Sequence, residues 1–312
     1  MSLLSFLRKP SASSNEDKSS ATLGNFLSDY SIEVMPRTAD KVESFCDILP
    51  LNTRVYIAHI EGTPIEDMVR TARRLNEEGF QVMPHFPARI LKDKHQLGEW
   101  ISQYEGEAGV DQALLLGGGL SAPAGDFEDS MQLVETGLFD GFKHLHFAGH
   151  PENNRDIDPD GSDHMVMQAL RWKQDFCERT DARVALTTQF CFESAPVIAW
   201  ADRLAAEGIN LPIHIGVAGP AKLQTLIKFS MACGVGPSMR VLQRRAKDVT
   251  KLLLPYEPSD LLAELSAHKE RHPNFGIEQV HFFPLGGIKT NANWVTQNAP
   301  VAGQPSSQTK KM

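Results

Sequence analysis

The order of its predicted elements constrains this chain most, because eight strand-like runs alternate with helical patterns along 312 residues. Several of these runs are almost continuously apolar, which is typical of parallel strands covered on both faces. The runs are Tyr30–Met35, Arg54–Ile60, Phe80–His85, Gln112–Leu116, His144–Ala148, Arg183–Gln189, Pro212–Val217 and Gln279–Phe283. Eight strands joined by helices predict an α/β fold, a closed (β/α)8 TIM barrel, rather than a doubly wound sheet.

Helical patterns fill the intervals between the strand-like runs. They are Ala39–Leu49, Pro64–Glu78, Asp93–Tyr104, Glu128–Gly137, Ser162–Glu178, Ala195–Glu207 and Pro220–Cys233. Gly79, Gly208 and Gly234 follow helices where a residue with positive φ is favoured. After Phe283 the sequence leaves room for only a short eighth helix before a polar tail.

The two ends of the chain differ in composition from its middle. Residues 9–21 and 298–312 are small, polar and rich in serine, as in disordered segments. We therefore expect a single domain: a flexible leader over residues 1–28, a barrel over 29–295 with a helical insertion at 237–272, and a disordered tail at 296–312.

Composition excludes some classes of partner. The net charge of −8 argues against binding to nucleic acid or to an anionic membrane surface, since both need a basic footprint. No apolar run approaches the ~20 residues that a helix needs to cross a bilayer. The four cysteines show neither close pairing nor the spacing of metal ligands, which predicts reduced, largely buried thiols in a cytoplasmic protein.

Glu33 is an acidic residue inside the first apolar run, between Ile32 and Val34. A buried carboxylate costs several kcal/mol unless it is paired or used. Because strand side chains alternate, Glu33 points to the face opposite Ile32 and Val34, and functional groups of barrels gather where strands end. We predict that Glu33 is a general acid with a raised pKa. The alternative is a buried ion pair with a lysine or arginine of a neighbouring strand.

Histidines suggest a second class of site. His144 and His146 share one face of the fifth strand, and His85 and His214 lie at or near other strand ends. Such a set can hold a metal in a barrel hydrolase. The end of the eighth strand supplies no carboxylate to complete the site, so packed or hydrogen-bonded histidines are the favoured interpretation and no metal is predicted.

Two further strand ends carry groups suited to a planar ligand. Gly117, Gly118 and Gly119 let a planar or phosphorylated molecule approach backbone N–H groups, although a flexible turn would use the same residues. Gln189 precedes Phe190, and an amide that both donates and accepts suits a heterocycle such as a pterin. A structural hydrogen bond of Gln189 is the alternative.

The order of motifs resembles the methylenetetrahydrofolate reductase family over roughly residues 30–291. The matching segments are Ser31-Ile-Glu-Val-Met-Pro36, Met83-Pro-His85, Ala148-Gly-His-Pro-Glu152, Thr188-Gln-Phe190 and Pro212-Ile-His-Ile-Gly216. The resemblance implies a (β/α)8 flavoprotein that uses FAD. It would interconvert 5,10-methylenetetrahydrofolate and 5-methyltetrahydrofolate with NADH or NADPH, in one-carbon metabolism and methionine biosynthesis. The implied partners are a reduced folate and the nicotinamide dinucleotide, and a homo-oligomer stays open.

Residue roles carried over from the resemblance fall into three groups. Glu33 would be the acid that protonates the folate. Substrate-binding residues would be Gln189, Phe190, Leu223 and Lys289. The flavin would be lined by His59, His85, Leu116, Gly117, Gly118, Ala148, Gly149, His150 and Glu152.

The chain departs from the family at its fourth strand. That strand usually ends Leu-Arg-Gly-Asp, whereas Leu115-Leu116-Gly117-Gly118 lacks both the arginine and the acid. A flavin-free folate-binding relative therefore stays as one alternative function, beside the metal-dependent barrel hydrolase.

Overall fold

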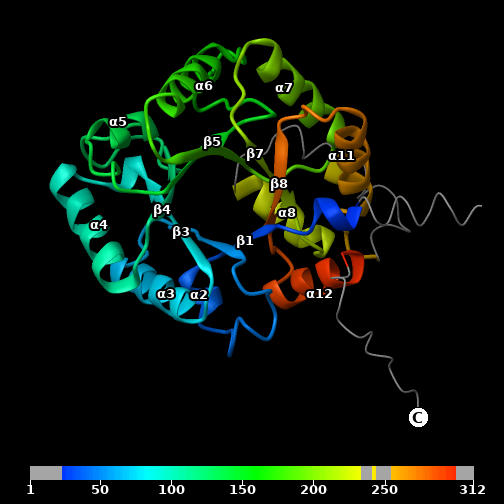
Figure 1. The fold of residues 1–312 in the computed structure, drawn as a ribbon, viewed down its shortest axis with the longest axis horizontal. Coiled ribbons are helices and arrows are strands. Elements are labelled where there is room, and N and C mark those ends of the chain that lie inside the picture. Colours follow the sequence, from blue (N-terminus) through cyan, green and yellow to red (C-terminus); the bar gives the residue numbers. More distant parts are fainter. Residues whose placement is uncertain (1–22, 233–240, 244–253, 300–312) are drawn as a thin grey trace, which may run out of the picture.

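The chain folds into a closed barrel of eight parallel strands, in the order β1 to β8 with β8 paired to β1. The structure is a computed structural model that describes residues 23–232, 241–243 and 254–299. Helices surround the strands as an outer ring (Figure 1). The predicted (β/α)8 fold is confirmed.

The strands lie within a few residues of their predicted bounds. They are β1 Ser31–Val34, β2 Arg54–Ile57, β3 Gln81–Pro87, β4 Gln112–Leu116, β5 His144–Gly149, β6 Arg183–Thr188, β7 Ile213–Ala218 and β8 Ile277–Phe283. The helices are α2 Pro36–Ala39, α3 Ile65–Glu77, α4 Lys94–Ala108, α5 Ser130–Glu135, α6 His164–Cys177, α7 Ser194–Ala206, α8 Leu223–Ala232, α11 Ser259–Arg271 and α12 Ile288–Asn298, and a 3-10 turn, η1, covers Ala88–Ile90. Gly79 and Gly208 have the expected positive φ, 88° and 79°.

The helix predicted over Ala39–Leu49 is wrong, because α2 ends at Ala39 and turns follow. Arg74 of α3 reaches under this segment and donates hydrogen bonds to the carbonyls of Ala39, Val42 and Glu43, at 3.1, 2.6 and 3.0 Å. Those carbonyls are thus satisfied by a guanidinium rather than by a helical ladder, and the apolar spacing of the segment reflects burial in a coil.

The chain ends also differ from expectation. Leu27 lies within the predicted leader yet is only 1% exposed and packs in the core. Helix α12 has eleven residues, so the eighth helix is not short, and it continues past residue 295 to Asn298. The predicted insertion at 237–272 contains α11, while residues 237–240 and 244–253 lie outside the described residues, as do Gly234, residues 1–22 and residues 300–312.

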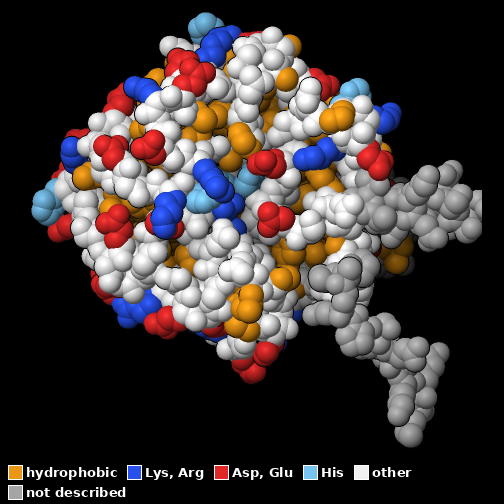
Figure 2. Space-filling model, in the orientation of Figure 1, with side chains coloured by type: hydrophobic (Ala, Val, Ile, Leu, Met, Phe, Trp, Pro, Cys, Tyr) orange, Lys and Arg blue, Asp and Glu red, His pale blue; other side chains and the backbone are white. Residues whose placement is uncertain are grey.

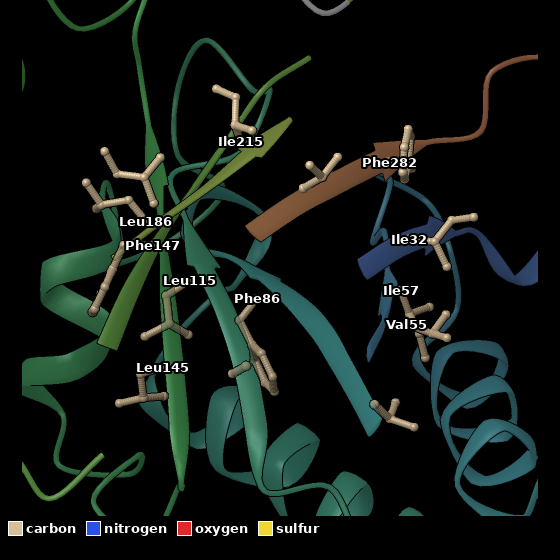
Figure 3. Close-up of a cluster of buried hydrophobic side chains, with 14 of the residues drawn as sticks. Ile32, Val55, Ile57, Phe86, Leu115, Leu145, Phe147, Leu186, Ile215 and Phe282 are labelled. Carbon is tan, nitrogen blue, oxygen red and sulfur yellow. The ribbon is translucent and has the colours of Figure 1, made fainter. Parts of the chain in front are cut away.

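The main core lies between the barrel wall and the helices. Alternate residues of every strand point outward into it (Figure 3); those labelled are Ile32, Val55, Ile57, Phe86, Leu115, Leu145, Phe147, Leu186, Ile215 and Phe282. Each such buried side chain contributes roughly 1.5–3 kcal/mol through removal of apolar surface from water. Because Ile32 and Val34 face this core, Glu33 between them faces the barrel interior, as predicted.

Polar side chains fill much of the barrel interior. Near the amino ends of the strands, Arg54 donates hydrogen bonds to Gln112 and Gln81, at 2.9 and 3.1 Å. Further along the barrel axis, the Tyr56 hydroxyl lies 2.6 Å from Nδ1 of His146. Tyr56 also packs with Met83 and Leu114 in a small apolar cluster separate from the main core. Hydrogen bonds as well as packing therefore hold these interior side chains in place.

The views in Figures 1 and 2 are toward the amino ends of the strands. From α3 through α7 the helices follow one another clockwise in Figure 1, and right-handed βαβ connections give this direction only from that end. Basic and histidine side chains lie together near the centre of this face (Figure 2). The carboxyl ends of the strands, where barrel sites form, are on the opposite face.

Two sequence expectations concern the chain as a whole. None of the helices within the described ranges is long and apolar enough to cross a membrane. The expectation of largely buried thiols is only partly right. Cys46, Cys177 and Cys191 are free, and of these three only Cys191 is buried, while Cys46 is exposed. Cys233 lies outside the described residues.

Candidate active site at the carboxyl end of the barrel

Glu33 lies between two imidazoles inside the barrel. Its Oε2 is 3.3 Å from Nε2 of His85 on β3 and 3.8 Å from Nε2 of His281 on β8. Neither Nε2 makes a hydrogen bond to any other described residue, so the Glu33 carboxylate is the polar group that both nitrogens face. The side chain of Glu33 is 17% exposed.

The charge of Glu33 differs from our expectation. Burial alone would raise the pKa of this carboxyl, but His281 and His85 together outweigh burial and hold its pKa at about 2. The prediction of a raised pKa is therefore wrong. The alternative, an ion pair with a lysine or arginine, is wrong as to the partner, since the neighbours are histidines. Glu33 is a carboxylate at neutral pH.

Ser31 contacts His281, the histidine of β8 that lies beside Glu33. Its hydroxyl lies 3.0 Å from Nδ1 of His281, and both residues are completely buried. In the register of β1 and β8, Ser31 is directly opposite His281. The imidazole thus spans from the Ser31 hydroxyl to the Glu33 carboxylate.

The histidines considered for a metal hydrolase are engaged with other groups. His146 binds Tyr56, and its ring lies 4.6 Å from that of His214 in an edge-to-face contact. His144 lies near the amino ends of the strands, with Nδ1 3.4 Å from the Arg54 guanidinium. Across the described residues, no group of three or more histidine, cysteine, aspartate or glutamate side chains is arranged to hold a metal ion.

The residues expected to bind substrate lie near β6, β7 and β8 but differ in exposure. Phe190 and Leu223 are buried in one apolar cluster, where the Phe190 ring is 5.3 Å from that of Phe283. Gln189 is half-buried, and its Oε1 accepts a hydrogen bond from the backbone N–H of Phe190. Lys289 is exposed in the first turn of α12. Phe190 and Leu223 thus form part of a wall, while Lys289 stands at the surface.

Some of the residues expected to line a flavin gather at one end of the barrel interior. His85 contacts Glu33, and Leu116 packs beside the Tyr56 cluster. Ala148 alternates with the outward-facing Phe147, so it points inward at the end of β5. Gly117 and Gly118 follow directly after Leu116.

Two further residues of that set, His59 and Gly149, pack against the outer helices. The ring of His59 stacks on Trp100 of α4, with centroids 4.8 Å apart, and its Nε2 pairs with the carbonyl of Thr63. A Cβ on Gly149 would meet Trp200 and Thr188 at 3.2 and 3.3 Å, so that side of Gly149 is closed by α7. His150 is half-buried; burial, with a smaller contribution from Lys173, lowers its pKa to about 4. Glu152 is half-buried and interacts with other residues. His59 and Gly149 are therefore the members of the predicted flavin set that pack against the helices.

Arg89 makes hydrogen bonds to the glycine loop after β4 and to residues that follow it. The backbone N–H of Arg89 donates to the carbonyl of Gly117 at 2.9 Å, and its guanidinium donates to the carbonyls of Leu120 and Glu128 at 2.9 and 3.0 Å. Gly118 has a φ of 97°, a conformation that favours glycine. The turn is thus fixed to Arg89 by hydrogen bonds and contains one residue position that favours glycine.

Ser31, Tyr56 and His281 belong to the site but had no role in the sequence analysis. The period of two along β1 places Ser31 on the same face as Glu33, and this signal was present in the sequence. Which histidine of another strand meets Glu33 depends on the register of β8 against β1, which no local pattern specifies.

No protein-family model matches this chain. A solved structure with a similar fold is described as an "Uncharacterized protein from Clostridium thermocellum binds two copies of 5-methyl-5,6,7,8-tetrahydrofolic acid". The two chains are 9% identical, the likeness covers 89% of this chain and 96% of that one, and the TM-score is 0.50. N-acetylneuraminate lyase from Mycoplasma synoviae is 12% identical over 80% of this chain and 75% of its own, with a TM-score of 0.32, too low to support an argument. The chain is thus similar in fold to a barrel that binds a reduced folate.

Proposed function

We propose that this protein binds a reduced folate at the carboxyl end of its barrel, with the pterin on Glu33. The observation that carries the proposal is the ionised Glu33, whose carboxylate lies between His85 and His281 and whose side chain is 17% exposed. The amino group and ring N–H of a pterin form a pair of adjacent donors, and a carboxylate accepts two such hydrogen bonds at once. The fold shared with a methyltetrahydrofolate-binding protein supports the same ligand class.

The apolar wall beside Glu33 suits the rest of such a ligand. Phe283 ends β8, next to the strand that carries Glu33, and its ring contacts Phe190 of the apolar cluster. An aromatic and aliphatic wall beside one polar anchor is the usual composition of a small-molecule site. Gln189 lies at the end of β6, adjoining this wall.

Flavin-dependent interconversion of methylene- and methyltetrahydrofolate with NADH or NADPH is our second candidate. The glycine loop after β4, together with the inward-facing Ala148 and His85, favours it. FAD would supply hydride transfer when bound. Because Glu33 is ionised, it would act on a cationic folate as a charge partner rather than as the proton donor.

Titration of the purified full chain with 5-methyltetrahydrofolate, followed by calorimetry, tests the main proposal. We expect saturable binding that weakens about 10- to 100-fold in Glu33→Gln, since hydrogen bonds to a charged group contribute about 1.5–3 kcal/mol. Glu135→Gln, at an exposed position of α5, is the matched control and leaves affinity unchanged. Wild-type protein that does not bind the folate, or equal affinity in Glu33→Gln, would overturn the proposal.

The absorption spectrum of the same protein tests the second candidate. Visible flavin bands, present on purification or after addition of FAD and dialysis, support a flavoenzyme. A protein that binds methyltetrahydrofolate but shows no flavin band after FAD is added is a flavin-free folate-binding barrel.

A further inference from the structure

Five polar side chains gather at the amino end of the barrel, opposite the proposed folate site. Each is the first residue of one of the consecutive strands β2 to β6, and we call them the amino-end cluster: Arg54, Gln81, Gln112, His144 and Arg183. The residues that follow them pack in the main core outside the barrel wall: Val55, Val82, Ala113, Leu145 and Val184. Because side chains alternate along a strand, the amino-end cluster faces the barrel interior. Basic and histidine side chains are visible at the centre of this face in Figure 2.

Arg54 binds the hydrogen-bond acceptors of the amino-end cluster. Its Nε donates to Oε1 of Gln112 at 2.9 Å, and its Nη2 donates to Oε1 of Gln81 at 3.1 Å. Nδ1 of His144 lies 3.4 Å from the same Nη2. Three neutral groups therefore hold Arg54 in place, and its Nη1 makes no hydrogen bond to a described residue.

The groups of the amino-end cluster that stay free are N–H donors. Since Gln81 and Gln112 turn Oε1 toward Arg54, their amide NH2 groups are left without an acceptor among the described side chains and carbonyls. When Nδ1 of a neutral imidazole accepts a hydrogen bond, the ring proton is on Nε2, so His144 also offers an N–H. A set of converging N–H donors suits an oxyanion.

The protein does not balance the positive charge at this end. Neither Arg54 nor Arg183 forms an ion pair with a carboxylate within the part of the chain that the structure describes. The neighbouring Asp111 is paired with Lys143, at 2.6 Å. Burial and then the two guanidinium groups lower the pKa of His144, against a smaller opposite effect of Asp111, so its imidazole is neutral at pH 7. Two unpaired guanidinium charges therefore lie at the mouth of a barrel whose chain has a net charge of −8.

We propose that the amino-end cluster binds a small dianionic oxyanion of the phosphate class. Guanidinium groups are well suited to phosphate oxygens, and two of them match the charge of a dianion better than that of a monocarboxylate. The glutamine amides and Nε2–H of His144 supply further donors for the remaining oxygens. Free phosphate and the phosphoryl group of a small metabolite share this chemistry. The site is separate from Glu33, so it goes beyond the proposed function.

Isothermal titration calorimetry of the full chain with inorganic phosphate, at constant ionic strength in a chloride buffer, tests this site. We expect saturable binding of phosphate and sulfate and no binding of acetate. Arg183→Gln should weaken phosphate binding about 10- to 100-fold, because it removes a charged hydrogen-bond donor. Arg37→Gln removes an exposed arginine of α2, which follows the carboxyl end of β1, and as the matched control it leaves phosphate binding unchanged.

Glycerol 3-phosphate distinguishes the two sources of the anion. Binding at least as tight as that of inorganic phosphate supports recognition of a phosphoryl group on a metabolite, and weaker binding supports the free ion.

A second variant removes the charge without removing an arginine. Gln112→Glu is nearly isosteric and places a carboxylate beside Nε of Arg54, so the variant, shown to be folded by circular dichroism, should lose phosphate binding. Phosphate that binds the wild type no better than acetate would overturn the inference. So would equal phosphate affinity in the wild type, Arg183→Gln and folded Gln112→Glu. Because the ligand and the variants differ from those of the folate titration, the two proposals fail separately.

Discussion

The hydroxyl of Tyr56 and Nδ1 of His146 lie 2.6 Å apart in the middle of the barrel, joining β2 to β5 across the interior. Thr187 of β6 completes the group, with its hydroxyl 3.2 Å from that of Tyr56 and 3.3 Å from the same imidazole nitrogen. Because these groups are buried, the free energy of unfolding depends on their hydrogen bonds as well as on apolar packing.

Tyr56→Phe should lower the free energy of unfolding by about 1–3 kcal/mol, because it removes the hydrogen bonds of the Tyr56 hydroxyl to a buried histidine nitrogen and a buried threonine hydroxyl. The measurement is urea denaturation followed by circular dichroism. Tyr104→Phe is a matched control, since the Tyr104 hydroxyl is buried and makes no hydrogen bond to a described residue. Its removal should be neutral or slightly stabilising. Equal losses in the two variants would contradict a specific role for the Tyr56–His146 bond.

Glu33 should stabilise the fold above the pKa of an unfolded glutamate, and this contribution should disappear in acid. Its pKa falls from 4.5 to about 2 on folding, so the folded state binds its proton less readily than the unfolded state. Stability therefore decreases as the pH falls from about 4.5 toward 2, by up to about 3 kcal/mol.

Comparison with Glu33→Gln isolates this contribution. The variant lacks the titrating group, so its free energy of unfolding should fall less steeply than that of the wild type between pH 4.5 and pH 3, measured by urea denaturation at each pH. Parallel curves for the two proteins would show that the histidines do not lower the pKa of Glu33.

Lys173 should also make stability rise with pH, but in the alkaline range. This lysine of α6 is buried, its Nζ donates to the carbonyl of Ala148 at 3.0 Å, and burial lowers its pKa from 10.5 to about 8. Because the unfolded state binds the proton more tightly, the wild type should gain stability relative to Lys173→Met as the pH rises from about 8 to 10.5. Urea denaturation at pH 7 and pH 10 measures the difference, and a difference that does not change with pH would contradict the burial of a charge.

Gly216→Ala should disrupt the barrel near the site, because a Cβ there would lie 2.3 Å from the carbonyl oxygen of Thr188 and 2.6 Å from backbone atoms of Gln189. Backbone atoms of an adjoining strand cannot move aside cheaply, so we expect a loss of about 1–3 kcal/mol or more. Gly106→Ala is the control, since a Cβ at this position of α4 meets nothing within 4 Å. Helix propensity predicts that it gains up to about 1 kcal/mol. Thermal unfolding of both variants measures these two changes in stability.

Part of the site could be predicted from the sequence, and part could not. The inward direction of Glu33 follows from the alternation of β1, and its place near a strand end follows from the barrel. Its charge does not, because the pKa depends on which side chains of β3 and β8 come within 4 Å. The segment after Ala39 shows the same limit, since its carbonyls are satisfied by Arg74, 31 to 35 positions away.

The sequence by itself determined the eight alternating strands, the outward core and the position of one acid on an inner face, because these depend on local periodicity and burial. Only the tertiary structure decided that His85 and His281 meet that acid, that Ser31 holds one of them, and that His59 and Gly149 face the helices. The physical reason is that contacts between distant strands depend on register and closure of the barrel, and a charge in its interior is set by those contacts.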